Sequence, residues 1–300
     1  MTKVFFYVIL RSCHTRILIV NFKTYLSLAM LMVALIVGNY QIPANAGSRY
    51  YNTRTVIKKP VSVVKPNNIS FWKIYEGFDQ SGRLKQAYTG DNVAFEKNNI
   101  ILEAFNEPTD NPLYATGIDD ERIYTKTAPY SGGKLILKEK FLYGHIGFMG
   151  KFPNSPGTMP SMWLFDESKT GDNKFYTEID LLEIPGSEKG NMYTGTHWGV
   201  DYQSLKKDFS KLYVRNVANT FHKYDIYKSP SKVVVLVDGM LIKEISTSNK
   251  KLPNGTNGFN QPLNLIINMN VGDVWGGEID DTKFPHKFDI KNLIIEKYKY

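Results

Sequence analysis

Apolar and polar residues alternate with a period of two in short segments through most of the chain after Ile69. The clearest pair of segments, 233–237 and 241–245, is joined by Asp238-Gly239, a dipeptide typical of tight β-hairpin turns. Similar segments are 93–103, with Asn98-Asn99 as a turn, 134–138, 143–152, 263–269 and 293–300. Many short strands separated by turns predict one β-sandwich or barrel rather than two domains.

One segment, 203–214, also has helical spacing, because Leu205, Phe209 and Leu212 recur at intervals of four and three. Residues 221–227, just beyond it, return to strand-like alternation. The segment is therefore a helix candidate in a chain that otherwise reads as strands, and a strand is the favoured alternative.

The first 46 residues have the pattern of a targeting segment. Basic residues precede an apolar run over 26–37, and Ala44-Asn45-Ala46 follows as a small-x-small cleavage site. This run is shorter than the roughly 20 residues that span a bilayer. We expect a cleaved secretory signal, an extracellular or periplasmic protein and no stable membrane insertion after cleavage; an uncleaved anchor is the alternative. Residues 47–68 read as a linker or lead-in strand.

Cysteine and charge exclude several classes of function. The only cysteine, Cys13, lies in the predicted signal, so the mature chain has no thiol for a disulfide, a zinc site or a nucleophile. The formal net charge of +8 also falls by half once the basic residues of the signal are removed. Without a concentrated basic patch, we expect no nucleic-acid partner.

Three carboxylates occur in Thr177-Glu178-Ile179-Asp180-Leu181-Leu182-Glu183-Ile184. On a strand, Glu178 and Asp180 project to one face, because side chains alternate with period two. Glu183 points to the other face unless a bulge at Leu181-Leu182 adds one residue and returns it. This spacing arises by chance about 0.3 times in a chain of this composition, so a solvated acidic face remains the plain alternative.

Paired carboxylates are the chemical groups of glycoside hydrolysis, in which one is ionised to attack and the other is protonated to donate. Crowded like charges favour this split, and Asp180 lies where it can share a proton with its neighbours. Sugar rings stack on aromatic surfaces, which makes Trp163, Trp198 and Trp275 candidate substrate-binding residues, with core packing as the alternative. His197 is a candidate for hydrogen bonding to a carboxylate or a sugar.

Metal chemistry has weaker support. Asp172 with Asn173, or Asp280 with Asp281, are candidates for a structural calcium ion, but neither stretch has the full spacing of a known calcium loop. The sequence has no serine nucleophile elbow and no zinc-spaced histidine pair. We expect no catalytic metal and no cofactor.

The ordered set of motifs resembles glycoside hydrolase family 16, the group of laminarinases, lichenases, agarases and carrageenases. The resemblance extends from Trp72 to Tyr300 and marks 69–300 as the catalytic domain. Its motifs are Tyr143-Gly144-His145, Lys151-Phe152-Pro153, GTMPSMWLF (157–165), EIDLLE (178–183), His197-Trp198-Gly199, Phe221-His222-Lys223-Tyr224, Val237-Asp238-Gly239 and NMNVGDVWGG (268–277).

The resemblance implies a jelly-roll β-sandwich of two curved antiparallel sheets with a substrate groove on the concave face. It implies Glu178 as nucleophile, Glu183 as general acid/base, Asp180 as the residue that tunes them, Trp163 as a platform and His197 beside the acid/base. Four positions depart from the family pattern and are expected to border the groove: Met159 for Trp, Thr177 for Gly, His145 for Arg and Asp273 for Gly.

These observations predict a secreted, endo-acting, retaining hydrolase of a β-linked polysaccharide, with a β-1,3- or mixed β-1,3/1,4-glucan as the first candidate. The Leu181-Leu182 spacing resembles that of laminarinases, agarases and carrageenases, so a galactan or exopolysaccharide substrate stays open. A transglycosylase with the same glutamates and a non-catalytic carbohydrate-binding protein are the rivals. We expect a monomer whose only partner is its polysaccharide.

Overall fold

The computed structural model describes residues 53, 57–78, 84–110, 126–166, 175–188, 190–200, 205–218 and 220–300. The predicted signal over 1–46 and the Asp172-Asn173 pair lie outside these residues. The described residues from 53 onward belong to one compact unit. In the part of the chain described, no helix has the length and apolarity needed to cross a membrane.

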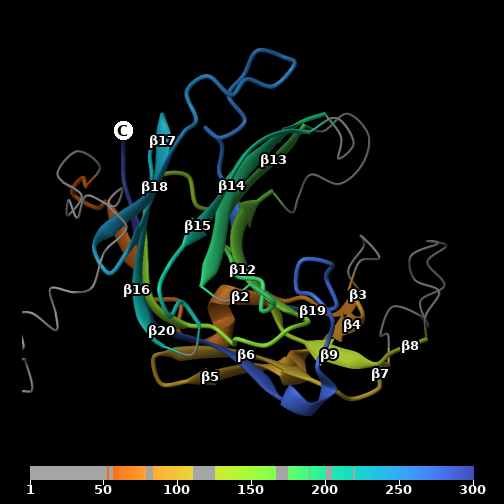
Figure 1. Cartoon of the computed structure of the whole chain (residues 1–300). Coiled ribbons are helices and arrows are strands. Elements are labelled where there is room, and N and C mark those ends of the chain that lie inside the picture. The colour runs from red at the N-terminus through yellow and green to blue at the C-terminus, as the bar shows by residue number, and fades with distance from the viewer. Residues whose placement is uncertain are drawn as a thin grey trace, which may run out of the picture. The chain divides into compact units, whose positions relative to one another are not determined.

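The larger sheet has eleven strands (Figure 1). Nine follow one path: β18 (Met240–Ser246), β17 (Lys232–Val237), β16 (His222–Lys228), β11 (Gly144–Lys151), β20 (His286–Lys297), β6 (Asn99–Phe105), β9 (Tyr130–Gly132), β4 (Gln86–Tyr88) and β3 (Gly77–Phe78). Strand β1 (Ser62–Val64) pairs with β20, and β5 (Val93–Glu96) pairs with β6. The pairs are antiparallel except β4 with β9.

The smaller sheet has seven strands in the order β15 (Lys206–Tyr213), β14 (Asn191–Gly199), β13 (Tyr176–Glu183), β12 (Thr158–Phe165), β19 (Asn264–Val271), β10 (Lys134–Leu137) and β2 (Trp72–Ile74). Strands β7 (Thr109–Asp110) and β8 (Thr127–Ala128) form a separate ribbon. The described part of the chain also contains the single-turn 3-10 helices η2 (Ile69–Phe71), η3 (Gly90–Asn92) and η7 (Asp281–Lys283).

The helix candidate over 203–214 is wrong where the structure describes it, because residues 206–213 form strand β15. Eight consecutive residues of β15 pair with β14. Backbone N–H and C=O groups that would bond within a helix are therefore bonded between the two strands. The predicted hairpin is present: Asp238 and Gly239, at φ angles of 51° and 78°, connect β17 to β18. Positive φ at both positions matches the turn that Asp-Gly favours.

The core lies between the two sheets, since each sheet turns every second side chain toward the other. The smaller sheet contributes Leu135, Leu164, Ile179 and Leu265, and the larger sheet contributes Ile146, Val235, Phe288 and Ile290 to the same buried cluster. The chain is therefore an all-β sandwich, as predicted. The opposite face of the smaller sheet is left to carry polar and aromatic side chains.

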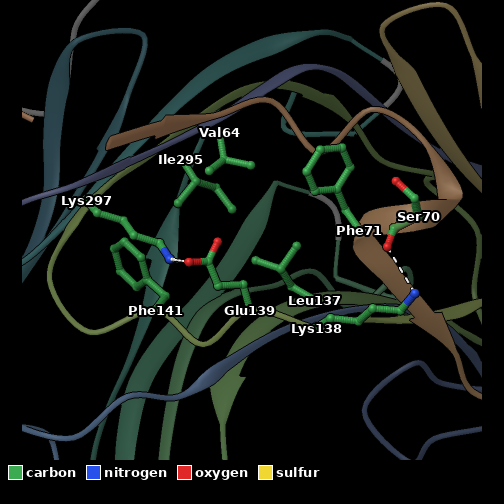
Figure 2. A pocket seen from close by; sticks show the side chains of 9 residues that line it. All are labelled: Val64, Ser70, Phe71, Leu137, Lys138, Glu139, Phe141, Ile295 and Lys297. Atoms are coloured by element: carbon green, nitrogen blue, oxygen red, sulfur yellow. Dashed lines mark hydrogen bonds and ion pairs between the residues drawn. The ribbon is translucent and has the colours of Figure 1, made fainter. Parts of the chain in front are cut away.

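A small hollow of about 140 Å³ lies where β1, β10 and β20 approach one another (Figure 2). Its walls are largely apolar, and Lys297 pairs with Glu139 at its edge. Lys138 lies in the same lining and donates from Nζ to the carbonyl of Ser70 at 3.0 Å. None of the predicted site residues lines this hollow.

Candidate active site

Strand β13 contains the bulge that the spacing of the carboxylates requires. Its pairing with β12 and with β14 shifts between Asp180 and Glu183. Leu181 and Leu182 are both fully buried in the core cluster, so two consecutive side chains point inward. Glu183 therefore returns to the face of Glu178 and Asp180. The predicted bulge is confirmed.

Each carboxylate has a defined neighbour on the adjoining strands. On β12, Phe165, Trp163 and Ser161 lie opposite Glu178, Asp180 and Glu183 in turn. On β14, the corresponding residues are His197, Gly195 and Tyr193. Because directly paired residues share a face, aromatic side chains flank the carboxylates on both sides.

Asp180 is the most buried of the three carboxyl groups, at 2% exposure. Its pKa is raised well above the usual value by burial first, and then by the charges of Glu178 and Glu183 and a hydrogen bond to Glu178. This shift favours the protonated form of Asp180, which can donate to Glu178. Glu178 also accepts a hydrogen bond from the Tyr176 hydroxyl.

Glu183 is suited to donating a proton. Burial, followed by the negative charges of Glu178 and Asp273, raises the pKa of Glu183 to about 8. Asp273 belongs to the loop after β19 and accepts the backbone N–H of Trp275 at 2.9 Å. A buried carboxyl group with a raised pKa is the kind of group that serves as a general acid.

His197 adjoins the carboxylates, with Nε2 at 3.2 Å from an Asp180 carboxylate oxygen. Burial lowers the pKa of His197, although the charge of Glu178 opposes the shift, so the ring is neutral at pH 7. One potential metal-ligand atom from each of Glu178, Asp180 and His197 lies within 4.8 Å of the others, a spacing that also fits a metal ion. The expectation of no catalytic metal stays a prediction.

The Asp280-Asp281 pair, a candidate for calcium, makes hydrogen bonds within the protein. Asp280 accepts from the backbone N–H of Thr282 at 3.1 Å, and Asp281 accepts from the Tyr130 hydroxyl at 2.7 Å. These contacts give both carboxylates a structural role.

Three aromatic rings form one wall of the site, which we call the aromatic wall: Tyr193, Phe209 and Trp275. The ring centres of Tyr193 and Phe209 are 5.6 Å apart, and Trp275 lies 5.3 Å from Tyr193 and 5.5 Å from Phe209. Trp275 is 45% exposed, so its ring is open to a ligand. Gly195 makes room for this arrangement, since a Cβ there would lie 2.3 Å from the Phe209 ring.

Trp163 lies on the other side of the carboxylates. Its Nε1 donates to Asn268 at 2.6 Å, Asn268 donates to Asn270 at 2.7 Å, and the Tyr88 hydroxyl donates to Asn270 at 2.6 Å. This chain of hydrogen bonds fixes the orientation of the indole ring.

Trp198 is not brought to the carboxylates. It pairs with Thr177 on the opposite face of the sheet, and its ring packs edge-on against Phe259 at 6.1 Å beside the core. Among the predicted aromatic residues, Trp163 and Trp275 share the carboxylate face. Tyr193 could have been predicted to lie on the carboxylate face, because it is four residues from His197 on the same strand. Phe209 could not, because its position depends on how β15 pairs with β14.

The four departures from the family pattern occupy different environments. Met159 pairs with Asn270 on the carboxylate face, and Asp273 lies in the loop that holds Trp275. The expectation that Thr177 borders the groove is wrong, because Thr177 is buried on the core side of the sheet and pairs with Trp198 there. The expectation that His145 borders the groove is wrong, because His145 lies on β11 of the larger sheet, between Asp225 at 2.9 Å and Glu296 at 3.0 Å.

The model of the glycosyl hydrolases family 16 matches residues 82–291 of this chain. The chain belongs to that family. A β-glucanase from Rhodothermus marinus is 25% identical over 225 residues, which is 72% of each protein. Xyloglucan endotransglucosylase/hydrolase protein 22 from Arabidopsis thaliana is 30% identical over 149 residues, covering 48% of this chain and 49% of that protein.

Solved structures agree with the fold of this family 16 chain. One, from work on endo-acting O-glycanases of the human gut microbiota that initiate mucin breakdown, has a TM-score of 0.70 at 25% identity and covers 79% of this chain and 89% of its own. The laminarinase catalytic domain from Thermotoga maritima has a TM-score of 0.65 at 21% identity, with 81% and 98% covered. The predicted jelly-roll class is confirmed.

Proposed function

We propose that this family 16 protein is a secreted, endo-acting, retaining glycoside hydrolase that cleaves a β-linked polysaccharide, with a β-1,3- or mixed β-1,3/1,4-glucan backbone as the first candidate. The observation that carries the proposal is the bulge in β13, which sets Glu178, Asp180 and Glu183 on one face. The similarity to a β-glucanase supports the choice of backbone.

In the proposed mechanism, the Glu178 carboxylate attacks the anomeric carbon while Glu183 gives its proton to the departing glycosidic oxygen. A covalent ester between Glu178 and the sugar results. Water then attacks the same carbon and gives a proton to Glu183, which releases the sugar with its original configuration. The raised pKa of Asp180 favours its neutral form beside Glu178, which limits the negative charge on this face.

Endo action is supported by aromatic rings on both sides of the carboxylates. Trp163 lies on β12 on one side, and the aromatic wall lies toward β14 and β15 on the other. Each offers a surface on which a sugar ring can stack, so a chain can be held on both sides of the bond that breaks.

The test is the release of reducing ends by the purified protein from laminarin, barley glucan, agarose and carrageenan, beside Glu178→Gln. We expect release from at least one polymer and its loss in Glu178→Gln, since the amide cannot act as a nucleophile. Undiminished release by Glu178→Gln would overturn the assignment. A change in the length of the polymer without new reducing ends would indicate a transglycosylase. Binding of a polymer without turnover would indicate a carbohydrate-binding protein.

A further inference from the structure

Three side chains of the carboxylate face, Glu178, Asp180 and His197, converge on one point. Glu178 and His197 are direct cross-strand partners on β13 and β14, and Asp180 follows Glu178 by two residues on β13. Directly paired residues, and residues two apart on a strand, share a face. The three side chains therefore project together, and one potential ligand atom from each lies within 4.8 Å of the other two.

Asp180 and His197 are spaced like two ligands of a single ion. The His197 Nε2 atom lies 3.2 Å from the Asp180 Oδ2 atom. Two ligands bonded at about 2.0–2.2 Å to a tetrahedral zinc ion are roughly 3.3–3.6 Å apart. An ion can therefore bind between these two atoms with little movement of either side chain.

The same oxygen of Asp180 lacks a hydrogen-bond partner. Asp180 is 2% exposed, and its Oδ2 atom is buried without a hydrogen bond to any residue that the structure describes. It faces His197 Nε2 without the alignment of a hydrogen bond. A buried polar atom left in this state costs free energy, which a bound cation would offset.

Glu178 can bind an ion without losing the hydrogen bond that it already accepts. The Tyr176 hydroxyl donates to Oε2 of Glu178. An ionised carboxylate has about four lone-pair sites on its two oxygens, so further sites remain for an ion. Tyr176 would then be an outer partner that orients the ligand, as such partners commonly do in metal sites.

The charges around the three ligands favour a cation. The carboxylate of Glu183 acts on the cluster, and Asp273, in the loop after β19, adds negative charge beside Glu183. Lys207 of β15 opposes them, but its charge acts on His197 less strongly than that of Glu178. A bound divalent cation would be the largest local charge and would reduce the repulsion among the carboxylates.

The chemical nature of the ligands indicates which ion fits. One imidazole nitrogen with two carboxylate oxygens is typical of zinc, whereas calcium takes six to eight oxygen ligands. Three protein ligands leave the fourth tetrahedral position open. The His197 side chain is 23% exposed, so solvent reaches the cluster.

We propose that Glu178, Asp180 and His197 bind a zinc ion that inhibits the enzyme. The ion engages the carboxylate that attacks the sugar, so zinc and glycan exclude each other, and the ion takes no part in catalysis. The inhibition rests on the proposed function, because it requires that Glu178 be the nucleophile. Zinc binding itself does not depend on turnover.

The experiment titrates zinc chloride into the chelator-treated, dialysed protein by isothermal titration calorimetry. The variant His197→Gln removes the nitrogen ligand and keeps a polar side chain. His222→Gln is the matched control, because His222 also contacts a carboxylate, that of Asp238 at 2.7 Å, but lies on β16 of the larger sheet. Calcium chloride tests for general attraction to negative charge, and melting temperatures show whether each variant is folded.

We expect zinc binding that His197→Gln weakens by at least about tenfold, since even the loss of an outer partner of a metal ligand costs 10–100-fold. The variant His222→Gln should bind zinc as the wild type does, and calcium should bind at least about tenfold more weakly than zinc. Zinc should also stop the release of reducing ends from a polymer that the wild type cleaves, and EDTA should restore it.

No zinc binding, or equal zinc binding by wild type and His197→Gln, would overturn the inference. An equal loss in His197→Gln and His222→Gln would overturn it too, as would bound zinc that leaves hydrolysis unchanged. Zinc binding that depends on His197, in a protein that cleaves no polymer, would support the metal site while the proposed function fails. Hydrolysis by a protein that binds no zinc would support the proposed function and overturn the metal site.

Discussion

The pKa values of Glu183 and Asp180 are raised in the folded protein for the same main reason, which is the loss of water around their carboxyl groups. The two groups differ in their neighbours. The negative charge of Asp273 raises the pKa of Glu183 further, whereas a hydrogen bond to Glu178 raises that of Asp180. The Asp273 carboxylate is one of the departures from the family pattern. It therefore gives this chain a proton donor that remains protonated to a higher pH.

The first prediction concerns the pH profile of hydrolysis. Activity of the wild-type protein should fall above about pH 8, as Glu183 loses its proton. Glu183→Gln should lower kcat by about 10²–10⁴-fold and remove this basic limb. Asp273→Asn, which keeps a polar acceptor near the Trp275 backbone, should move the limb to lower pH by up to about one unit. The measurement is kcat/KM against pH, and an unchanged limb in Asp273→Asn would exclude this electrostatic role.

At the scale of the strand, the bulge in β13 explains why an odd spacing works as an active site. Leu181 and Leu182 both enter the core, so the residue after them regains the outward direction. A regular strand would need Glu183 one position earlier to reach the same face.

Deletion and insertion at this point should therefore have opposite effects on catalysis. Deleting Leu182 creates a regular strand with the glutamate still outward, so measurable hydrolysis should remain while stability falls by about 2–5 kcal/mol from the lost leucine. Inserting alanine between Leu181 and Leu182 also gives an even spacing, but it moves the glutamate one same-face position, roughly 7 Å, farther from Glu178 along the strand and should abolish hydrolysis. Reducing-end assays and urea unfolding measure the two effects, and an active insertion variant would contradict the role of the bulge.

For the whole molecule, the carboxylate cluster ties stability to pH. The pKa values of Asp180 and Glu183 in the fold lie above their unfolded values of 3.8 and 4.5. Unfolding therefore releases protons, and these groups favour the fold most at low pH. Their contribution is lost as pH rises through the folded pKa values.

Replacing Glu183 by glutamine should make this visible. Between pH 4, where the wild-type carboxyl is largely protonated in both states, and pH 8, the variant should gain about 4 kcal/mol of stability relative to the wild type. Urea unfolding at the two pH values measures the difference. A constant difference across this range would exclude the proton as its cause.

The sequence predicts local features well and relationships between strands poorly. The turn at Asp238-Gly239 and the bulge at Leu181-Leu182 follow from backbone geometry and from period-two alternation. Phe209 was missed, because its position depends on pairing with β14, and nothing in the local pattern encodes that partner. Trp198 illustrates the same limit, since one position from His197 along a strand means the opposite face.

Gly195 has a consequence for how sequences of related proteins should vary. The Phe209 ring occupies the space that a side chain at position 195 would need. A relative with alanine at the position of Gly195 should therefore have a smaller residue at the position of Phe209, and glycine should accompany the large ring. Covariation of these two positions would mean that the residue at position 195 limits the size of the ring at position 209, and so the extent of the aromatic wall beside the carboxylates.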